Sequence, residues 1–267
     1  MAEVCPDLLN LADGQSHILL LLDFDGTLSE IAPSPEEAIL RPGNAALLGR
    51  LARHPKCTVG VISGRALEDV SRKVGVPGLA YAGNHGLEID GTGLQYLHPD
   101  AAAALPAIAR AAGELDAALS DVTGAFVENK TLTLTVHFRQ TPEQFHDAVA
   151  AVFDDAARPL VSAGLCRVTT AKSALELRPA VDWDKGRALT LIRSRLAPDA
   201  FPIYIGDDAT DEDAFQAAQD VGGAGVFVGP ADATTCAHWR LDTPADVTQA
   251  LAELSGLGFP GPVTSTG

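Results

Sequence analysis

The chain has 267 residues and a formal net charge of −16, because 19 Lys and Arg face 35 Asp and Glu. Counterion release on a phosphate-rich polymer needs a surplus of basic side chains, so we expect no nucleic-acid partner. The same deficit disfavours anionic membrane surfaces. Hydrophobic residues make up 46% of the chain, which is typical of a globular protein. A length of 267 residues suits one large domain, or one domain with a second inserted or appended.

The cysteines are spread widely over the chain: Cys5, Cys57, Cys166 and Cys236. A zinc site needs closely spaced ligands and a disulfide framework is denser, so we expect reduced thiols in a cytoplasmic protein. The acidic residues 1–10 do not resemble the start of a secretory signal. The longest apolar run, residues 18–22, is far short of the roughly 20 residues of a membrane span. We therefore expect a soluble protein without membrane contact, and a monomer.

Five short apolar runs predict buried strands, at residues 17–24, 57–62, 78–82, 202–205 and 224–228. Helical patterns follow them, at residues 45–53, 66–74, 185–196 and 212–219. Continuous apolar strands that alternate with helices indicate a parallel sheet covered on both faces. We therefore predict a doubly wound, mostly parallel α/β fold, whose functional side chains gather at the carboxyl ends of the strands.

The middle of the chain has a different pattern. Residues 101–118 and 141–158 favour helix, and residues 168–178 favour strand. Residues 131–139 alternate strictly, which indicates a half-buried antiparallel strand. One face of that strand would carry Leu132, Leu134, Val136 and Phe138. We predict an inserted α+β module with an open-faced sheet at residues 99–179, between core segments 1–98 and 180–267. Residues 256–267 would form a frayed tail.

Two carboxylates, Asp23 and Asp25, end the first predicted strand within the sequence DFDGT. Alternation aims both side chains the same way, and Gly26 lets the chain turn sharply. Two close acids repel each other, which a bound cation and a proton would relieve. An acidic loop or helix cap is the simple alternative, but the apolar run and the DxDGT spacing favour a site.

A second acidic cluster, GDDATDED at residues 206–213, directly follows another apolar run. Five acids in seven residues exceed what helix capping needs, although Thr210 or Asp211 can also cap a helix. Oxygen ligands favour a hard cation, and a few carboxylates beside a phosphate favour Mg²⁺. The alternative is a solvated acidic helix start.

Two smaller elements indicate an anionic ligand. Ser63, Gly64 and Arg65 end a strand and begin a helix, where a hydroxyl and backbone N–H groups can bind an anion; taken alone, a helix cap explains them as well. Lys185 lies at another helix start, where a cation is unfavourable against the helix dipole. An exposed lysine is the alternative there.

Together, DFDGT, Ser63, Lys185 and GDDATDED resemble, in this order, the motifs of the haloacid dehalogenase (HAD) superfamily of phosphohydrolases. The resemblance implies a HAD-like Rossmannoid core. It also implies that Asp23 is a nucleophile forming an aspartyl-phosphate and that Asp25 is the general acid and base. The resemblance further implies that Mg²⁺ is bound by Asp23, the Asp25 carbonyl and Asp207, with Asp208 or Asp211 acting through water. It implies that the phosphate group is bound by Thr27, Ser63, Gly64 and Lys185.

Further segments resemble the trehalose-6-phosphate phosphatases, over roughly residues 17–230. They are YAGNHGLE at 81–88, VENK at 127–130, HFR at 137–139 and LELRP at 175–179. In that family the inserted module is a cap that closes over the active site, and the resemblance implies that Glu128, Lys130 and Glu176 bind sugar hydroxyls. Many members have Gly after ENK and Tyr in HYR, where this chain has Thr131 and Phe138.

Six other residues are predicted to contact substrate: Arg65, Asn84, His85, Gly86, His137 and Arg139. Each has a structural alternative. Arg65 can pair with a neighbouring acid, residues 84–86 can shape a turn, and His137 and Arg139 can lie on a solvated sheet face.

The resemblance implies a Mg²⁺-dependent phosphomonoesterase that converts trehalose 6-phosphate to trehalose and phosphate in trehalose biosynthesis. One alternative is a related capped phosphatase for sucrose 6-phosphate or mannosyl-phosphoglycerate. Another is a regulatory domain phosphorylated on Asp, like a two-component receiver, and a third is a non-catalytic HAD-like binding protein. A receiver lacks a second Asp two residues after the phosphorylated one, so Asp25 and the inserted module disfavour it.

Overall fold

The computed structural model describes residues 6–171 and 173–257. Cys5 and the predicted frayed tail from residue 258 onward lie outside the described residues. The chain divides into two compact units. The core unit comprises Met1–Tyr96 and Trp183–Gly267, and the inserted unit comprises Leu97–Asp182. Residues 99–179, predicted as an inserted module, fall in the inserted unit.

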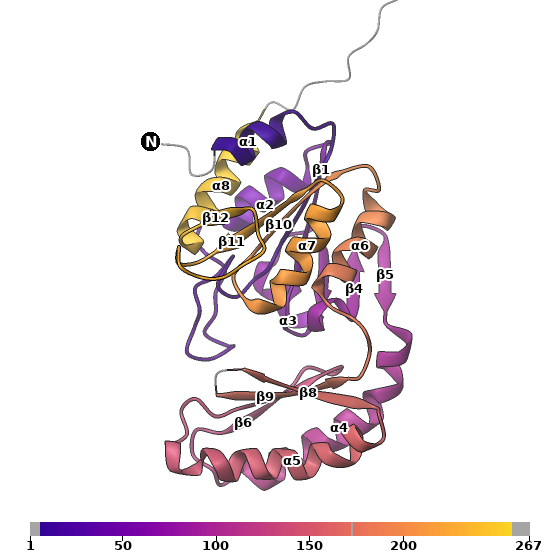
Figure 1. Ribbon diagram of the computed structural model, residues 1–267, viewed down its shortest axis with the longest axis vertical. Helices are drawn as coiled ribbons and strands as arrows, with labels where there is room; N and C mark the ends of the chain where they lie inside the picture. Colours follow the sequence, from indigo (N-terminus) through magenta and orange to yellow (C-terminus); the bar gives the residue numbers. More distant parts are fainter. Residues whose placement is uncertain (1–5, 172, 258–267) are drawn as a thin grey trace, which may run out of the picture. The chain divides into compact units, whose positions relative to one another are not determined.

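The core unit is built on an eight-stranded sheet of order β12-β11-β10-β1-β2-β3-β4-β5 (Figure 1). From β12 to β3 every neighbouring pair is parallel, and β4 runs antiparallel to β3. This order confirms the predicted mostly parallel α/β fold. The strands are β1 (Ile18–Leu22), β2 (Cys57–Ile62), β3 (Ala80–Gly83), β4 (Glu88–Gly91), β5 (Leu94–Leu97), β10 (Phe201–Gly206), β11 (Ala224–Val228) and β12 (Trp239–Leu241).

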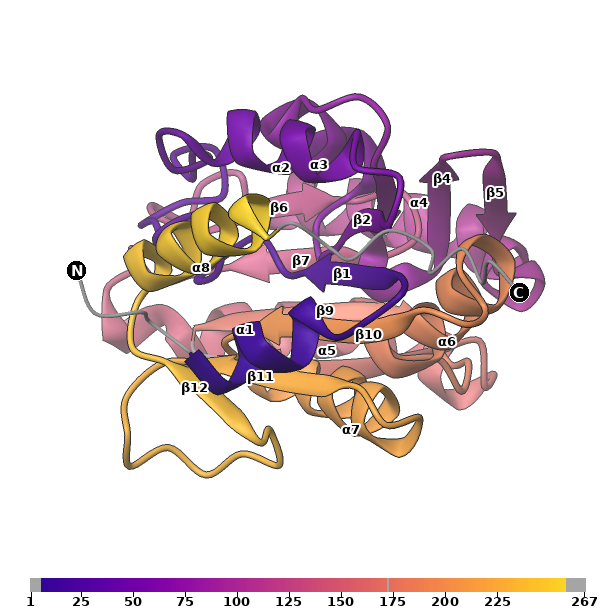
Figure 2. The ribbon, with the colours of Figure 1, turned by 90° about the horizontal axis from the view of Figure 1, so that it is seen from above.

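Helices cover both faces of this sheet (Figure 2). One face packs against α1 (Pro6–Asp13), α2 (Asn44–Ala52), α3 (Leu67–Val74) and α8 (Pro244–Gly256), and the other against α6 (Lys185–Leu196) and α7 (Glu212–Asp220). The central strand β1 shows the consequence for sequence: Ile18, Leu20 and Leu22 enter one core, and Leu19 and Leu21 enter the other. An uninterrupted apolar run is what two buried faces require.

The inserted unit has a four-stranded antiparallel sheet of order β6-β7-β9-β8. Its strands are β6 (Phe126–Asn129), β7 (Leu134–His137), β8 (Cys166–Ala171) and β9 (Ala174–Pro179). The helices α4 (Pro99–Leu119) and α5 (His146–Ser162) lie together against one face of it (Figure 1). Apolar side chains of β7 and β9, among them Leu134, Val136 and Leu177, pack under these helices. The opposite face therefore carries the alternate, polar side chains.

The helix predicted at 141–158 begins and ends later, as α5. The strands of the inserted unit differ from the prediction in two places. The strand predicted at 131–139 is only Leu134–His137, because the Lys130 N–H bonds to the Thr133 carbonyl at 2.9 Å and Thr131 has φ 70°. That turn joins β7 to β6, a strand that the short FVEN segment did not indicate. The stretch predicted at 168–178 is a hairpin of β8 and β9. The burial of Leu132, Leu134, Val136 and Phe138 is confirmed.

Within residues 6–171 and 173–257, no helix combines the length and the hydrophobicity that crossing a bilayer requires.

A short turn after β3 packs against helix α6. It is the 3₁₀ segment η1 (Asn84–Gly86), which follows β3 and has positive φ at all three residues. A Cβ on Gly86 would lie 2.2 Å from the Cβ of Ala188 on α6. Because no carbon atoms approach so closely, only glycine at this position lets the turn and the helix meet.

Gly86→Ala should therefore destabilise the core unit by about 3 kcal/mol, from the left-handed backbone and the clash together. Gly78→Ala is the matched control, because Gly78 also has positive φ (+83°) but an added Cβ would meet nothing within 4 Å. We expect it to cost about 1 kcal/mol. Urea unfolding of both variants measures the difference, and equal losses would contradict the packing argument.

Candidate active site

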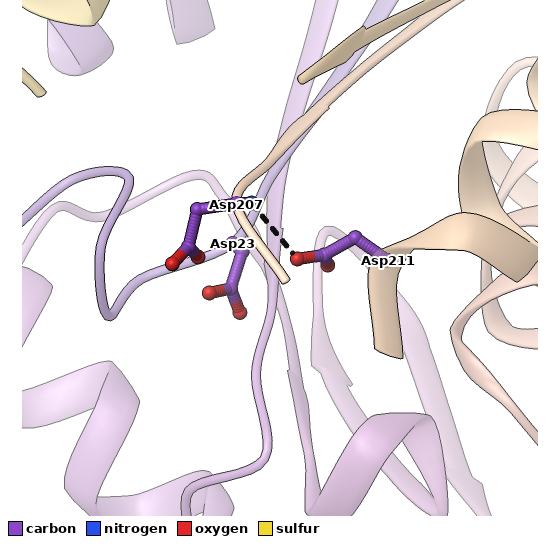
Figure 3. Close-up of side chains that lie close together, drawn as sticks. All are labelled: Asp23, Asp207 and Asp211. Atoms are coloured by element: carbon purple, nitrogen blue, oxygen red, sulfur yellow. Dashed lines mark hydrogen bonds between the residues drawn. The ribbon is translucent and has the colours of Figure 1, made fainter. Parts of the chain in front are cut away.

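The sheet order brings the two acidic segments together. Strands β1 and β10 are parallel neighbours, with Leu22 beside Ile205, and the Asp23 N–H bonds to the Ile205 carbonyl at 2.9 Å. The residues that follow both strands therefore emerge at one carboxyl edge, as the strand-end prediction required. Figure 3 shows Asp23, Asp207 and Asp211 gathered there.

These three aspartates could hold a cation. One carboxylate oxygen from each of Asp23, Asp207 and Asp211 lies within 4.8 Å of the others. Gly26 makes room for the cluster, since a Cβ there would lie 2.0 Å from an Asp207 oxygen. Carboxylate oxygens are ligands for hard cations such as Mg²⁺, so the donor set fits the ion that the sequence indicated.

The negative charges of the cluster are only partly balanced by the nearby Lys185. Burial, with repulsion from neighbouring acids that Lys185 only partly offsets, raises the pKa of Asp23 well above its usual value. Burial and the carboxylates of Asp211 and Asp208 raise the pKa of Asp207 to about 7. A divalent cation would remove the repulsion that raises both.

Lys185 places an ammonium group among these acids. Its Nζ donates to Asp23 Oδ1 and to Asp211 Oδ1, each at 2.8 Å, and the side chain is 3% exposed. Burial alone would lower the pKa of Lys185, but Asp211 and Asp23 raise it overall. Its ammonium is therefore kept charged beside Asp23. The position of Lys185 at a helix start predicted an anionic partner, and the carboxylates of Asp23 and Asp211 are two such partners.

Asp211 is held by four donors. Its Oδ1 accepts from Lys185 and from the Tyr204 hydroxyl at 2.6 Å, and its Oδ2 accepts the N–H groups of Asp207 and Asp208 at 3.0 and 3.1 Å. With both oxygens engaged, Asp211 shapes the loop that presents Asp207. Tyr204 was not among the predicted site residues because it lies in an apolar run. The available signal was the tyrosine in a central strand, because a buried tyrosine hydroxyl needs a hydrogen-bond partner.

Arg65 grips Asp25. Its Nε and one terminal nitrogen donate to the two oxygens of Asp25, both at 2.7 Å, and the other terminal nitrogen donates to Asp69 at 2.8 Å. This is the acid pairing that the sequence left as the alternative for Arg65. The sequence analysis did not single out Asp69, whose position one helical turn after Arg65 was the available signal.

The turn at residues 84–86 supports the Ser63–Arg65 segment. The Asn84 N–H bonds to the Arg65 carbonyl at 2.7 Å, and the His85 N–H bonds to the Ser63 carbonyl at 2.9 Å. The His85 ring lies against Gly64, where a Cβ would be 2.9 Å from Cε1. The turn-shaping alternative for Asn84, His85 and Gly86 is thus present, and their contact with substrate stays a prediction.

Thr27 has a buried hydroxyl for which the described residues provide no hydrogen-bond partner. A buried hydroxyl without a partner is costly. Its place directly after Gly26 is compatible with the phosphate-binding role predicted for it, which stays a prediction.

The predicted sugar-binding residues form two clusters within the inserted unit. Lys130 Nζ lies 2.5 Å from Glu176 Oε1, and the hydroxyls of Thr133 and Thr169 lie 3.3 and 3.2 Å from the two Glu176 oxygens. His137 Nε2 lies 2.7 Å from Glu128 Oε2 and stacks on Phe126. Arg139 is exposed. Charged and hydroxyl groups of this kind are suited to binding polar ligands.

Comparison with known proteins agrees with the geometry. The sequence model of the trehalose-phosphatase family matches residues 21–244. The chain belongs to the trehalose-phosphatase family. A trehalose-phosphate phosphatase of Mycobacterium avium (strain 104) is 41% identical over 257 residues, and the match covers 91% of this chain and 64% of that protein. The chain thus spans less than two thirds of the length of this relative.

Solved structures support the fold assignment. The C-terminal domain of a C. albicans trehalose-6-phosphate phosphatase superposes with a TM-score of 0.78 at 24% identity, covering 94% of this chain and 96% of that one. A haloacid dehalogenase-like hydrolase from Bacteroides thetaiotaomicron superposes with a TM-score of 0.60 at 18% identity, covering 89% and 99%. Both share the α/β fold of this chain.

Two isosteric substitutions in the 207–211 loop should affect stability differently: one should destabilise the fold and the other should not. Asp211→Asn breaks a buried ion pair and should cost about 3–5 kcal/mol. Asp207→Asn removes a carboxylate whose charge is unfavourable without a cation, so in EDTA at pH 8 the variant should be at least as stable as the parent. Chemical unfolding in EDTA tests this pair. Destabilisation by Asp207→Asn as large as by Asp211→Asn would refute the assigned roles.

Proposed function

We propose that the protein is a phosphomonoesterase that hydrolyses trehalose 6-phosphate to trehalose and phosphate. The observation that carries the proposal is the buried Asp23 carboxylate held by Lys185 beside Asp207 and Asp211. That arrangement offers a nucleophile, a fixed positive charge for phosphoryl oxygens and ligands for a cation. Membership of the trehalose-phosphatase family supports the choice of sugar.

Asp23 would begin the reaction by attacking phosphorus. The bond between phosphorus and the sugar oxygen breaks, Asp25 gives that oxygen a proton, and an aspartyl-phosphate forms on Asp23. Asp25 then takes a proton from a water molecule that attacks phosphorus. The bond to Asp23 breaks and inorganic phosphate leaves. Lys185, Ser63, Thr27 and Gly64 would hold the phosphoryl oxygens.

Mg²⁺ is the proposed cofactor. Asp23, Asp207 and the Asp25 carbonyl would hold it, with Asp208 or Asp211 acting through water. The bound ion would offset the charge of the acids and of the phosphoryl group. The chain's own contribution is the arrangement of donors, with Gly26 leaving space and Asp211 fixing the loop.

Selectivity for the sugar is assigned to the inserted unit. We propose that residues 99–179 act as a cap and that Glu128, Lys130 and Glu176 bind sugar hydroxyls, as charge-assisted hydrogen bonds would favour. The pairing of Lys130 with Glu176 supports a fixed orientation for both. Contacts from His137 and Arg139, and a cytoplasmic monomer, stay predictions.

Phosphate release from a panel of sugar phosphates should be greatest with trehalose 6-phosphate, should stop in EDTA and should return with Mg²⁺. Asp23→Asn should lower turnover by at least about 10³-fold, because no other carboxylate replaces the nucleophile. Circular dichroism serves as the folding control. Greater release from sucrose 6-phosphate or mannosyl-phosphoglycerate would overturn the sugar assignment, and multiple turnovers by Asp23→Asn would refute the covalent mechanism.

Cation binding should weaken as the pH falls below about 7. The folded, ion-free protein keeps a proton on Asp207, with pKa about 7, whereas the unfolded chain ionises near 3.8. The free energy of unfolding without the ion should therefore fall as the pH rises between these values. A cation must displace that proton below pH 7, so its affinity should drop by up to about tenfold per pH unit. Calorimetric Mg²⁺ titrations at pH 5.5, 6.5 and 7.5 measure this, with proton release read from buffers of different ionisation enthalpy. An affinity independent of pH would contradict it.

A further inference from the structure

Asp25 has to move two protons in the proposed reaction, yet its position does not fix it. The side chain is 41% exposed, and a half-exposed aspartate can change rotamer at little cost. General acid and base catalysis needs the carboxyl group within hydrogen-bond reach of the reacting oxygen. Something other than burial must therefore hold it.

Arg65 holds it by a two-point contact. Two of its nitrogens donate to the two oxygens of Asp25, each at 2.7 Å. A bidentate pair of this kind fixes the plane of the carboxylate as well as its distance, which a single hydrogen bond or a lysine does not. The Asp25 side chain stays partly exposed in this contact.

Arg65 is itself immobilised. Its third nitrogen donates to Asp69, which also accepts from Arg72 at 2.6 Å, and its guanidinium lies 5.3 Å from the centre of the Phe24 ring. The side chain is only 7% exposed. Its backbone N–H donates to Ser63 Oγ at 3.2 Å. Helix α3 therefore anchors Arg65 through Asp69, and Arg65 anchors Asp25.

The same contacts disfavour direct recognition of substrate by Arg65. Its Nε and both terminal nitrogens already donate to carboxylates. A guanidinium committed in this way has little freedom to turn toward a sugar or a phosphate. Its charge is also offset by the two acids it contacts.

We infer that Arg65 is a positioning residue, held in place by Asp69, that orients the Asp25 carboxylate to take the proton from the attacking water. The inference rests on the proposed function, because it assigns Asp25 the acid and base roles. It predicts a defect in turnover with little change in KM. Substrate recognition by Arg65 would instead raise KM.

A substrate that needs no general acid separates these possibilities. The p-nitrophenolate leaving group departs without a proton, so phosphorylation of Asp23 proceeds while water attack still needs the base. Asp25→Asn should therefore accumulate phosphoenzyme from p-nitrophenyl phosphate, seen by mass spectrometry after acid quench. Arg65→Gln should do the same to a large extent, and its kcat for trehalose 6-phosphate should fall about 10- to 100-fold, part of what general acid–base catalysis contributes.

Three further variants complete the test. Arg65→Lys keeps the positive charge but loses the planar group that donates two hydrogen bonds, so its kcat should stay close to that of Arg65→Gln. Asp69→Asn should show a smaller loss of kcat in the same direction. Arg158→Gln, which removes an exposed arginine paired with Asp155 on α5, should behave like the parent.

The outcomes are distinguishable from failure of the proposed function. If the parent releases no phosphate from either substrate, or Asp25→Asn traps no phosphoenzyme, the proposed function or its covalent step fails. If the parent and Asp25→Asn behave as expected but Arg65→Gln raises KM at unchanged kcat, the positioning role is refuted. Recovery of full kcat by Arg65→Lys would also overturn it, because charge alone would then suffice.

Discussion

The site depends on the buried contacts of Lys185 with Asp23 and Asp211. Removing a charge from water is costly unless a partner of opposite sign compensates it, and here one ammonium compensates two carboxylates. The same contacts tie the end of β1 to the loop after β10 through the start of α6. Among the residues that the structure describes, no cation pairs with Asp207 as Lys185 pairs with Asp23, and this surplus of negative charge makes the edge suited to a divalent cation. A net charge of −16 is thus compatible with a phosphate ligand.

The charged residues close to the site have two different roles: some fix the backbone of a loop, and others orient a side chain. Asp211 accepts hydrogen bonds from four donors and fixes the positions of Asp207 and Lys185. Asp25, in contrast, stays partly exposed and is held by its salt bridge with Arg65. The end of strand β1 positions Asp23, the proposed nucleophile, and the contact with Arg65 positions Asp25, the proposed acid and base. Precise placement of both is what proximity effects in catalysis require.

The sequence predicted much of the core because its signals were local. Buried parallel strands such as β2 and β11 need continuous apolar runs, and helix α6 has clear periodicity, so their bounds were predicted closely. The sequence did not predict the hairpin of β8 and β9 or the strand β6, since short strands carry little periodicity. The pairing of Arg65 with Asp25 depends on residues 40 apart in the chain, and the hydrogen bond of Tyr204 is hidden in an apolar run. Local patterns could not decide these tertiary contacts between side chains.

The nucleophilic role of Asp23 is the central claim, and locating the transferred phosphoryl group tests it most directly. The parent enzyme, acid-quenched during turnover of trehalose 6-phosphate with Mg²⁺ and then digested, should yield a phosphorylated peptide containing Asp23, with the group mapped to that carboxylate by fragmentation. Reduction with borohydride should convert Asp23 to homoserine. A phosphoryl group mapped to Asp25 or Asp207, or turnover with Asp23 unmodified throughout, would contradict the account.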